Sequence, residues 1–186
     1  MDSKRFEFKD QFCSADFAAQ RTNKYAVQAC LLHFMQKQKK SCNDLYFDTY
    51  VDWKIIRTFA KRPSQPFEYC ADINSMSDEE YAEYQDELSD RFKNEHQYSR
   101  DTIIKFCLSL DLSLAESYEL MHYSGYTFSA VDERDNVILQ CIAEFEEQGF
   151  NTEKNVTRVD YVNEKLSAKK LKRLPTINEK NDYLYG

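Results

Sequence analysis

The sequence predicts an all-α fold of about six helices. Apolar residues recur at helical spacing in several separate stretches, and a serine, threonine, asparagine or aspartate precedes most of them, as expected of helix N-caps. The chain has only three glycines and three prolines, which leaves little material for the tight turns of an all-β protein. Hydrophobic residues make up 42 % of its 186 residues, which is enough for a core.

Two prolines three residues apart, Pro63 and Pro66, mark the clearest interruption of the chain. They end a helix and favour extended backbone, because proline lacks the amide hydrogen and restricts the residue before it. We therefore expect an N-terminal helical subdomain, residues 1–65, and a helical domain, residues 66–175. Residues 176–186 are expected to form a flexible tail.

The N-terminal subdomain should hold an arm and two helices. Phenylalanines alternate in residues 1–13, and we expect a packed arm there because no partner strand is near. One helix should run from residue 14 or 16 to about residue 40, and the next from residue 43 or 44 to about residue 62. Basic residues on these helices could contact phosphate, although solvated helix surfaces commonly carry such charges. These residues are Lys37, Lys39, Lys40, Lys54, Arg57, Lys61 and Arg62.

A strongly acidic helix should follow, opened by a capping box formed by Ser77 and Glu80. Between Asp78 and Glu95 the chain carries eight acidic and two basic residues. Its apolar and aromatic side chains recur at helical spacing, so a solvated amphipathic helix is the ordinary interpretation. Those side chains are Tyr81, Tyr84, Leu88 and Phe92.

The acidic helix also has a functional interpretation. An acidic surface with tyrosines could capture a basic partner, such as a nucleic-acid-binding protein, by imitating phosphate. The partner-binding residues would be Tyr81, Tyr84, Asp86 and Glu87.

Two short helices are predicted between Ser99 and Gly125. Ser99 is a suitable N-cap for the first, while Ser113 and Glu116 form a capping box for the second. Gly125 is suited to the left-handed position that ends a helix. Both helices present aliphatic faces, so a helix hairpin in the core is one interpretation.

The stretch SRDTIIKFCLSLDLSLAESYELMHYSGY, residues 99–126, resembles the last two helices of Xre/Cro/lambda-repressor-like helix-turn-helix domains. The sequence up to about residue 166 is similar to a helical extension that some bacterial members carry. The resemblance implies a helix-turn-helix-like core within residues 66–175 and a non-enzymatic, DNA-associated regulator. In that family the DNA-reading helix lies just before this stretch. Here the acidic helix takes that place, and it would be repelled by phosphate.

Two further helices should complete the domain. The first is expected from Ser129 or Asp132 to Gly149, and the second from Asn151 or Thr152 to Pro175. The second is rich in lysine and arginine and could lie on a phosphate backbone, or against the acidic helix of the same or a second copy. Under the regulator hypothesis, phosphate contacts come from Arg100, Lys105, Lys169, Lys170, Lys172 and Arg173.

Composition and missing motifs exclude several classes of protein. The formal charge is −7, so the chain as a whole should not bind nucleic acid non-specifically. No apolar run could span a bilayer and the charged N-terminus is no secretory signal, so we expect a cytoplasmic protein with no membrane partner and with its six cysteines reduced. There is no glycine-rich phosphate loop and no Ser-His-Asp arrangement. Cys30 and His33 form a single pair where zinc sites normally have two.

We therefore predict no enzyme activity, no metal site and no cofactor. The leading hypothesis is the DNA-associated regulator. The alternative is a protein-binding module or inhibitor that acts through the acidic helix, for example a phage or mobile-element protein that blocks a nucleic-acid enzyme. Exposed aromatic stripes would suit a homodimer, although the same residues could be core.

Overall fold

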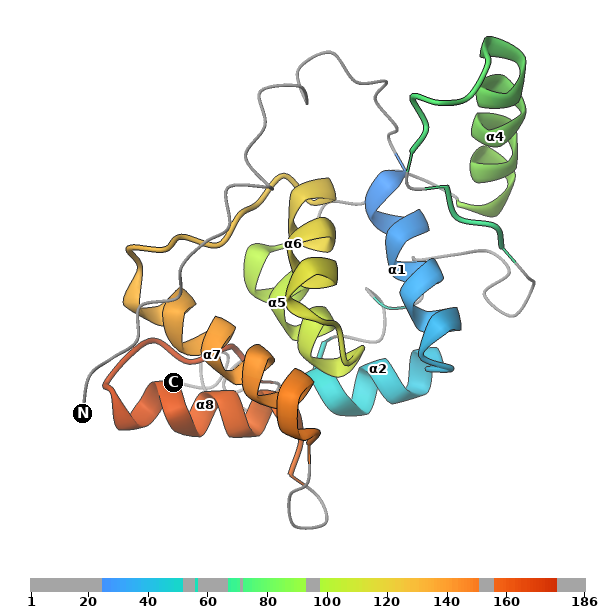
Figure 1. The fold of residues 1–186 in the computed structure, drawn as a ribbon. Helices are drawn as coiled ribbons and strands as arrows, with labels where there is room; N and C mark the ends of the chain where they lie inside the picture. Colours follow the sequence, from blue (N-terminus) through green and yellow to red (C-terminus); the bar gives the residue numbers. More distant parts are fainter. Residues whose placement is uncertain are drawn as a thin grey trace, which may run out of the picture.

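The computed structural model describes residues 25–51, 56, 67–70, 72–92, 98–150 and 156–176. Within them the protein has seven helices and no strand, which confirms the predicted all-α class (Figure 1). The helices are α1 (Ala26–Lys37), α2 (Cys42–Thr49), α4 (Asp78–Arg91), α5 (Arg100–Ser109), α6 (Leu114–Tyr123), α7 (Glu133–Gln148) and α8 (Arg158–Ala168). None of these described helices is both long and apolar enough to cross a membrane.

Helices α5 and α6 lie at the centre of the molecule (Figure 1). Helix α5 packs against α2, α6 and α8, while α6 packs against α1 and α7. The main core fills the space between these helices with fully buried side chains from every one of them. It includes Phe34, Leu45, Phe106, Leu120, Ile138 and Val162. The predicted hairpin of α5 and α6 is therefore the part of the chain around which the other helices pack.

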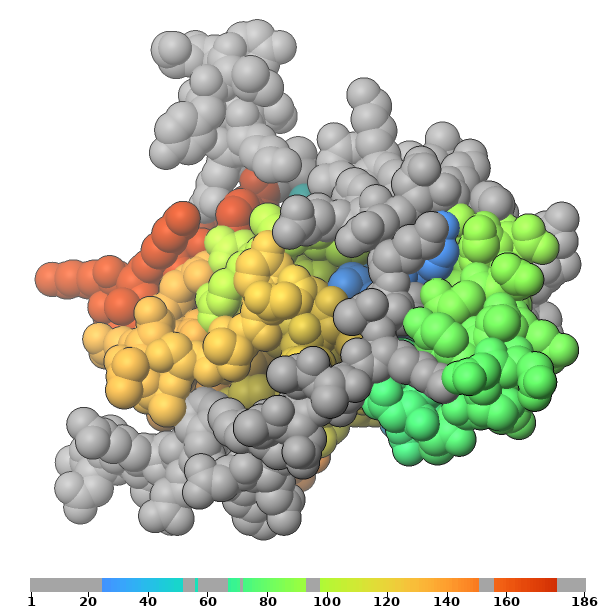
Figure 2. All heavy atoms as spheres, turned by 90° about the horizontal axis from the view of Figure 1, so that it is seen from above, coloured from blue at the N-terminus to red at the C-terminus, as the bar shows by residue number. Residues whose placement is uncertain are grey.

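A second, smaller core joins α4 to α1. Leu88 and Phe92 of the α4 region pack with Leu32 of α1 and with Phe67. The guanidinium of Arg91 lies 5.3 Å from the centre of the Phe67 ring and is itself buried. Helix α4 stands at one edge of the molecule, away from α7 and α8 (Figures 1 and 2).

The starts of four helices and the glycines that follow two of them were predictable from local sequence. The side chains of Ser77, Ser99, Ser113 and Asp132 each accept a hydrogen bond from the backbone N–H three residues later, as expected of N-caps. The predicted capping boxes are present at the starts of α4 and α6. Gly125 and Gly149 follow α6 and α7 with φ of 74° and 70°, a conformation that favours glycine.

The predicted boundaries of three helices were wrong. Helix α2 begins after Ser41 and ends at Thr49, because Tyr50 takes a left-handed conformation with φ of 54°. Helix α1 ends at Lys37 rather than near Lys40. Helix α8 begins after Thr157, which forms a capping box with Asp160, and it ends at Ala168 rather than Pro175. The predicted arm, the predicted start of α1 and residues 177–186 lie outside the described residues.

Candidate functional site

The last part of the described chain folds back on α8 and forms the base of a cationic surface. After α8 ends at Ala168, Lys170 takes a left-handed conformation with φ of 58° and reverses the chain. Leu174 is then fully buried in the main core. The side-chain amide of Asn163 donates to the Leu174 carbonyl at 3.0 Å, and its oxygen accepts from the Leu174 N–H at 2.7 Å.

Side chains from α5 and α7 also fix this returning segment. The guanidinium of Arg134 donates to the carbonyls of Lys172 and Arg173, at 2.8 and 3.4 Å, and forms an ion pair with Asp101 at 2.9 Å. The ammonium of Lys105 donates to the Pro175 carbonyl at 3.0 Å. Three helices thus bind the backbone carbonyls of residues 172–175, so the segment is held in one position.

The basic side chains of the returning segment, and Lys165 on α8, are exposed. Lys165, Lys169, Lys170, Lys172 and Arg173 are all exposed, and we call these five residues the basic end. Figure 2 shows side chains of the α8 region (red) projecting from the left edge of the molecule. The amino group of Lys165 lies 4.9 Å from the centre of the Tyr161 ring, and this cation–π contact holds the Lys165 side chain against α8. The basic end therefore combines an anchored backbone with exposed cations.

Two predicted phosphate-contacting residues do not belong to this surface. Lys105 is only 5 % exposed, and its ammonium donates a hydrogen bond to the Pro175 carbonyl. Arg100 donates to the Thr127 carbonyl at 3.0 Å and pairs with the buried carboxylate of Asp135 at 2.5 Å. Both cations hold helices and loops together, and the basic end does not include them.

The acidic helix forms a surface of opposite sign. All seven carboxylates of α4 are exposed, whereas Arg91, the one basic residue of α4, is buried against Phe67. We call these carboxylates the acidic face; they belong to Asp78, Glu79, Glu80, Glu83, Asp86, Glu87 and Asp90. Hydrogen bonds from the Ser77 backbone and side chain lower the pKa of Glu80 at the capped end. The acidic face thus carries no exposed cation of its own helix, although the buried guanidinium of Arg91 lies 4.0 Å from the Glu87 carboxylate.

The predicted partner-binding residues divide between this surface and the core. Asp86 and Glu87 are exposed on α4, and Tyr81 is half-buried. Tyr84 is only 7 % exposed, because its ring stacks near Phe67, and its hydroxyl accepts from the Cys70 N–H at 3.4 Å. Burial raises the pKa of Tyr84 to about 12, so it stays neutral. We correct its assignment from partner contact to core residue.

The acidic face and the basic end lie at opposite ends of the molecule (Figures 1 and 2). The basic end therefore does not lie against the acidic helix of its own chain, which was one of the arrangements considered from the sequence. Opposite charges at the two ends give the described part of the protein a strong polarity.

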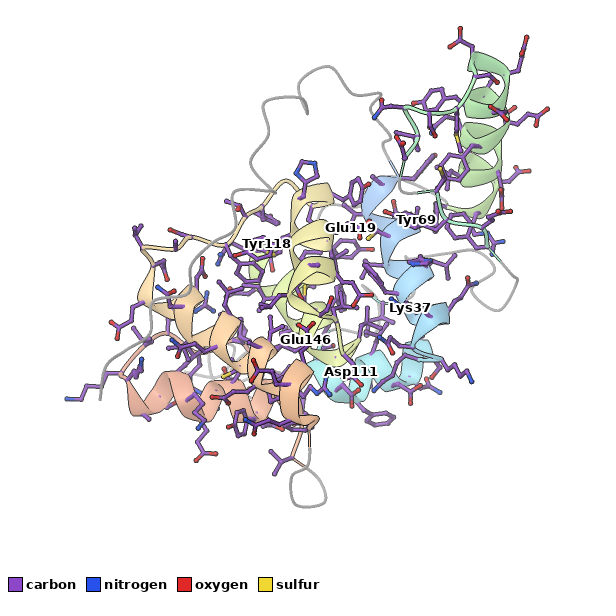
Figure 3. All side chains as sticks on the ribbon, viewed as in Figure 1. Lys37, Tyr69, Asp111, Tyr118, Glu119 and Glu146 are labelled. Atoms are coloured by element: carbon purple, nitrogen blue, oxygen red, sulfur yellow. The ribbon has the colours of Figure 1, made fainter. Side chains whose placement is uncertain are left out.

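A cluster of titratable groups lies between α1 and α6, but it has a structural role. The Tyr69 hydroxyl donates to Glu119 at 2.8 Å (Figure 3). The His33 ring stacks on Tyr69, with 4.7 Å between the ring centres. Burial raises the pKa of Tyr69 far above its usual range and also that of Cys30. The Tyr69 hydroxyl and the Cys30 thiol therefore stay neutral near neutral pH, and a neutral thiol is a poor nucleophile. No three His, Cys, Asp or Glu side chains of the described residues converge on a possible metal position.

Sequence reasoning missed the residues that anchor the basic end, Asn163 and Arg134. A signal for Asn163 was present, since it lies four residues after Val159 and three before Leu166, on the apolar side of α8. A polar side chain at such a position needs a hydrogen-bonding partner. Arg134 gave no comparable signal, because arginine in the first turn of a helix is ordinarily solvated.

Comparison of the chain with family models, with curated proteins and with solved structures finds no match. The resemblance of residues 99–166 to repressor-like domains therefore stays a prediction.

Proposed function

We propose that this protein is a non-enzymatic, DNA-associated regulator that contacts the phosphate backbone through the basic end. The observation that carries the proposal is the set of five exposed cations on backbone that three helices hold in place. A fixed backbone presents these cations without ordering a loose chain on binding, which lowers the entropic cost of the complex. The repressor-like resemblance of α5 and α6 supports the same class.

The distribution of charge reconciles this proposal with the net charge of −7. The acidic face lies at the opposite end of the molecule from the basic end (Figure 1). Repulsion by phosphate therefore turns the acidic face away from DNA when the basic end approaches the backbone. At about 0.15 M salt the screening length is roughly 8 Å, and the distant carboxylates would weaken the contact only slightly. Contacts of this kind position a protein on DNA and carry no base specificity.

Fluorescence anisotropy with a 30-base-pair duplex tests the proposal. If the basic end neutralises about four or five phosphates, the logarithm of the affinity should fall with the logarithm of salt with a slope of roughly −4. Lys172→Glu should weaken binding at low salt and reduce this slope by about one. Asn43→Asp combined with Gln148→Glu lowers the net charge by the same two units at exposed residues of α2 and α7, neither of which was predicted to contact phosphate, and is the matched control.

Two results would overturn the assignment. If Lys172→Glu and the Asn43→Asp, Gln148→Glu control lose affinity equally, binding follows net charge rather than the basic end. If wild-type protein shows no binding even at about 20 mM salt, where electrostatic contacts are strongest, the regulator proposal fails.

A specific observation favours the protein-binding module as a second candidate. In α4 the one cation is buried and all seven carboxylates are exposed, which leaves an acidic surface suited to a basic partner. Asp86→Lys combined with Glu87→Lys should abolish capture of a nucleic-acid-binding protein. The control is Glu133→Lys with Glu147→Lys, which makes the same charge change on α7. Capture that survives the α4 changes, or that both pairs abolish equally, would exclude the acidic face as the contact.

A further inference from the structure

A hollow of about 640 Å³ opens where α2, α5 and α8 meet. Its lining combines aromatic, aliphatic and charged side chains, including Phe47, Asp48, Tyr50, Asp111, Val156 and Arg158. Figure 3 shows Asp111 beside α2, at this junction. The hollow lies at the N-terminal end of α8, whereas the basic end begins near its C-terminal end, roughly 16 Å along an 11-residue helix.

Apolar groups are unusually exposed around this hollow. Among the described residues, the exposed large hydrophobic side chains are Val131 at 94 %, Phe47 at 69 % and Val156 at 40 %. Phe47 and Val156 both border the hollow. The same surface therefore carries a protruding aromatic side chain, Phe47, and a hollow beside it. Aromatic side chains of this kind are enriched at protein interfaces and commonly act as anchors there.

The charges around the hollow are balanced. Lys40 pairs with Asp48 at 3.0 Å, and Arg158 pairs with Asp111. Asp48 also accepts from the Ser109 hydroxyl at 3.2 Å, and Tyr50 donates to Asp160 at 3.0 Å. Both cations and carboxylates line the hollow, so a twofold-related copy of the same surface can place carboxylates opposite cations. The acidic face and the basic end could not meet their own copies in this way, because each carries charges of one sign.

We propose that this surface is the contact between two copies of the chain. In a twofold dimer the same patch serves both partners, so Phe47 of each copy enters the hollow of the other. Val156 and the ion pairs Lys40–Asp48 and Arg158–Asp111 belong to the same lining. The contact lies at the opposite end of α8 from the basic end, so both basic ends stay exposed in the dimer. This proposal does not depend on DNA binding, and its test uses no DNA.

Sedimentation equilibrium of the full chain between about 1 and 200 μM tests the proposal. Wild-type protein should show a monomer–dimer equilibrium in this range. Phe47→Asp should raise the dissociation constant by at least roughly tenfold, as expected for an interface anchor. Val131→Asp is the matched control, because it introduces the same charge at an even more exposed hydrophobic residue outside the hollow, and it should dimerise like wild type.

Val156→Asp gives a second, independent disruption on a different element, and it should also weaken the dimer. Far-UV circular dichroism establishes that each variant keeps its helices. Wild-type protein that stays monomeric at 200 μM overturns the proposal and leaves a small ligand as the occupant, since the volume is typical of such sites. A dimer that neither Phe47→Asp nor Val156→Asp weakens overturns it as well, because the contact then lies elsewhere.

Discussion

The side-chain amide of Asn163 hydrogen-bonds both backbone polar groups of Leu174. The amide nitrogen of the side chain donates to the Leu174 carbonyl at 3.0 Å, and the amide oxygen accepts from the Leu174 N–H at 2.7 Å. Both residues are buried, so neither backbone group of Leu174 has access to bulk water. One asparagine thereby fixes the chain reversal that carries the exposed lysines of the basic end.

Replacing Asn163 should therefore destabilise the whole protein. Asn163→Ala leaves the N–H and C=O of Leu174 buried without partners, and each unsatisfied group costs about 1–3 kcal/mol. We expect the free energy of unfolding to fall by about 2–4 kcal/mol, measured by urea denaturation. Trypsin should also cleave native Asn163→Ala faster after Lys169–Arg173, because the returning segment is released.

Glu164→Ala is the control for this change, since Glu164 is the neighbouring residue on α8 and is exposed. It should alter stability by no more than about 0.5 kcal/mol. An Asn163→Ala protein as stable as this control would show that the paired hydrogen bonds contribute nothing.

Arg100 should behave as a structural residue in a stability measurement. It pairs with the buried carboxylate of Asp135, which also accepts from the Ser129 N–H at 2.8 Å. Arg100→Leu leaves that carboxylate without its cation, and we expect a loss of about 2 kcal/mol of stability. Lys169→Leu removes an exposed cation and should be nearly neutral. Equal stabilities of the two variants would show that the Arg100–Asp135 pair does not stabilise the fold.

Local signals in the sequence predicted much of this fold. The starts of α4, α5, α6 and α7 depend on hydrogen bonds that span three residues, so serine or aspartate at the right spacing is sufficient to place them. The all-α class followed from helical periodicity and from the scarcity of glycine and proline. The position of Gly149 after α7 was predictable for the same local reason.

Long-range contacts decided what the sequence could not predict. Lys105 and Pro175 are 70 residues apart in the sequence. Only the fold shows that the ammonium of Lys105 donates a hydrogen bond to the Pro175 carbonyl. Tyr84 had the spacing of an apolar stripe, but whether it faced a partner or Phe67 depended on where residues 67–70 lie. The early end of α2 at Thr49 depends on Tyr50, whose hydroxyl reaches Asp160 on α8.

The five thiols of the described residues should divide into two classes in a labelling experiment. Burial raises the pKa of Cys107 and of Cys141 to about 12, and that of Cys30 well above its ordinary value. Cys42 and Cys70 are only partly buried, although burial also raises the pKa of Cys42. Iodoacetamide at pH 8, followed by peptide mass spectrometry, should label Cys42 and Cys70 first, because the thiolate reacts and needs access.

The three buried thiols should react only after denaturation. Labelling in about 6 M guanidinium chloride supplies the control, since every thiol is then accessible. Native Cys107 labelled as fast as native Cys70 would contradict the packing of α5 against α6.

His33 should make the protein less stable as the pH falls below neutrality. Burial of the ring, which stacks on Tyr69, lowers the pKa of His33 below its ordinary value near 6.5. The unfolded chain therefore binds a proton at a higher pH than the folded chain, and stability is lost as the pH falls below about 6.5. His33→Gln cannot take up this proton, so its free energy of unfolding should depend less on pH between about 6.5 and 5. Between pH 7 and 8 His33 is neutral in both states, and the two proteins should give parallel stability curves. Urea denaturation at half-unit intervals measures both ranges, and curves that stay parallel below pH 6.5 would show that His33 is not held in its neutral form.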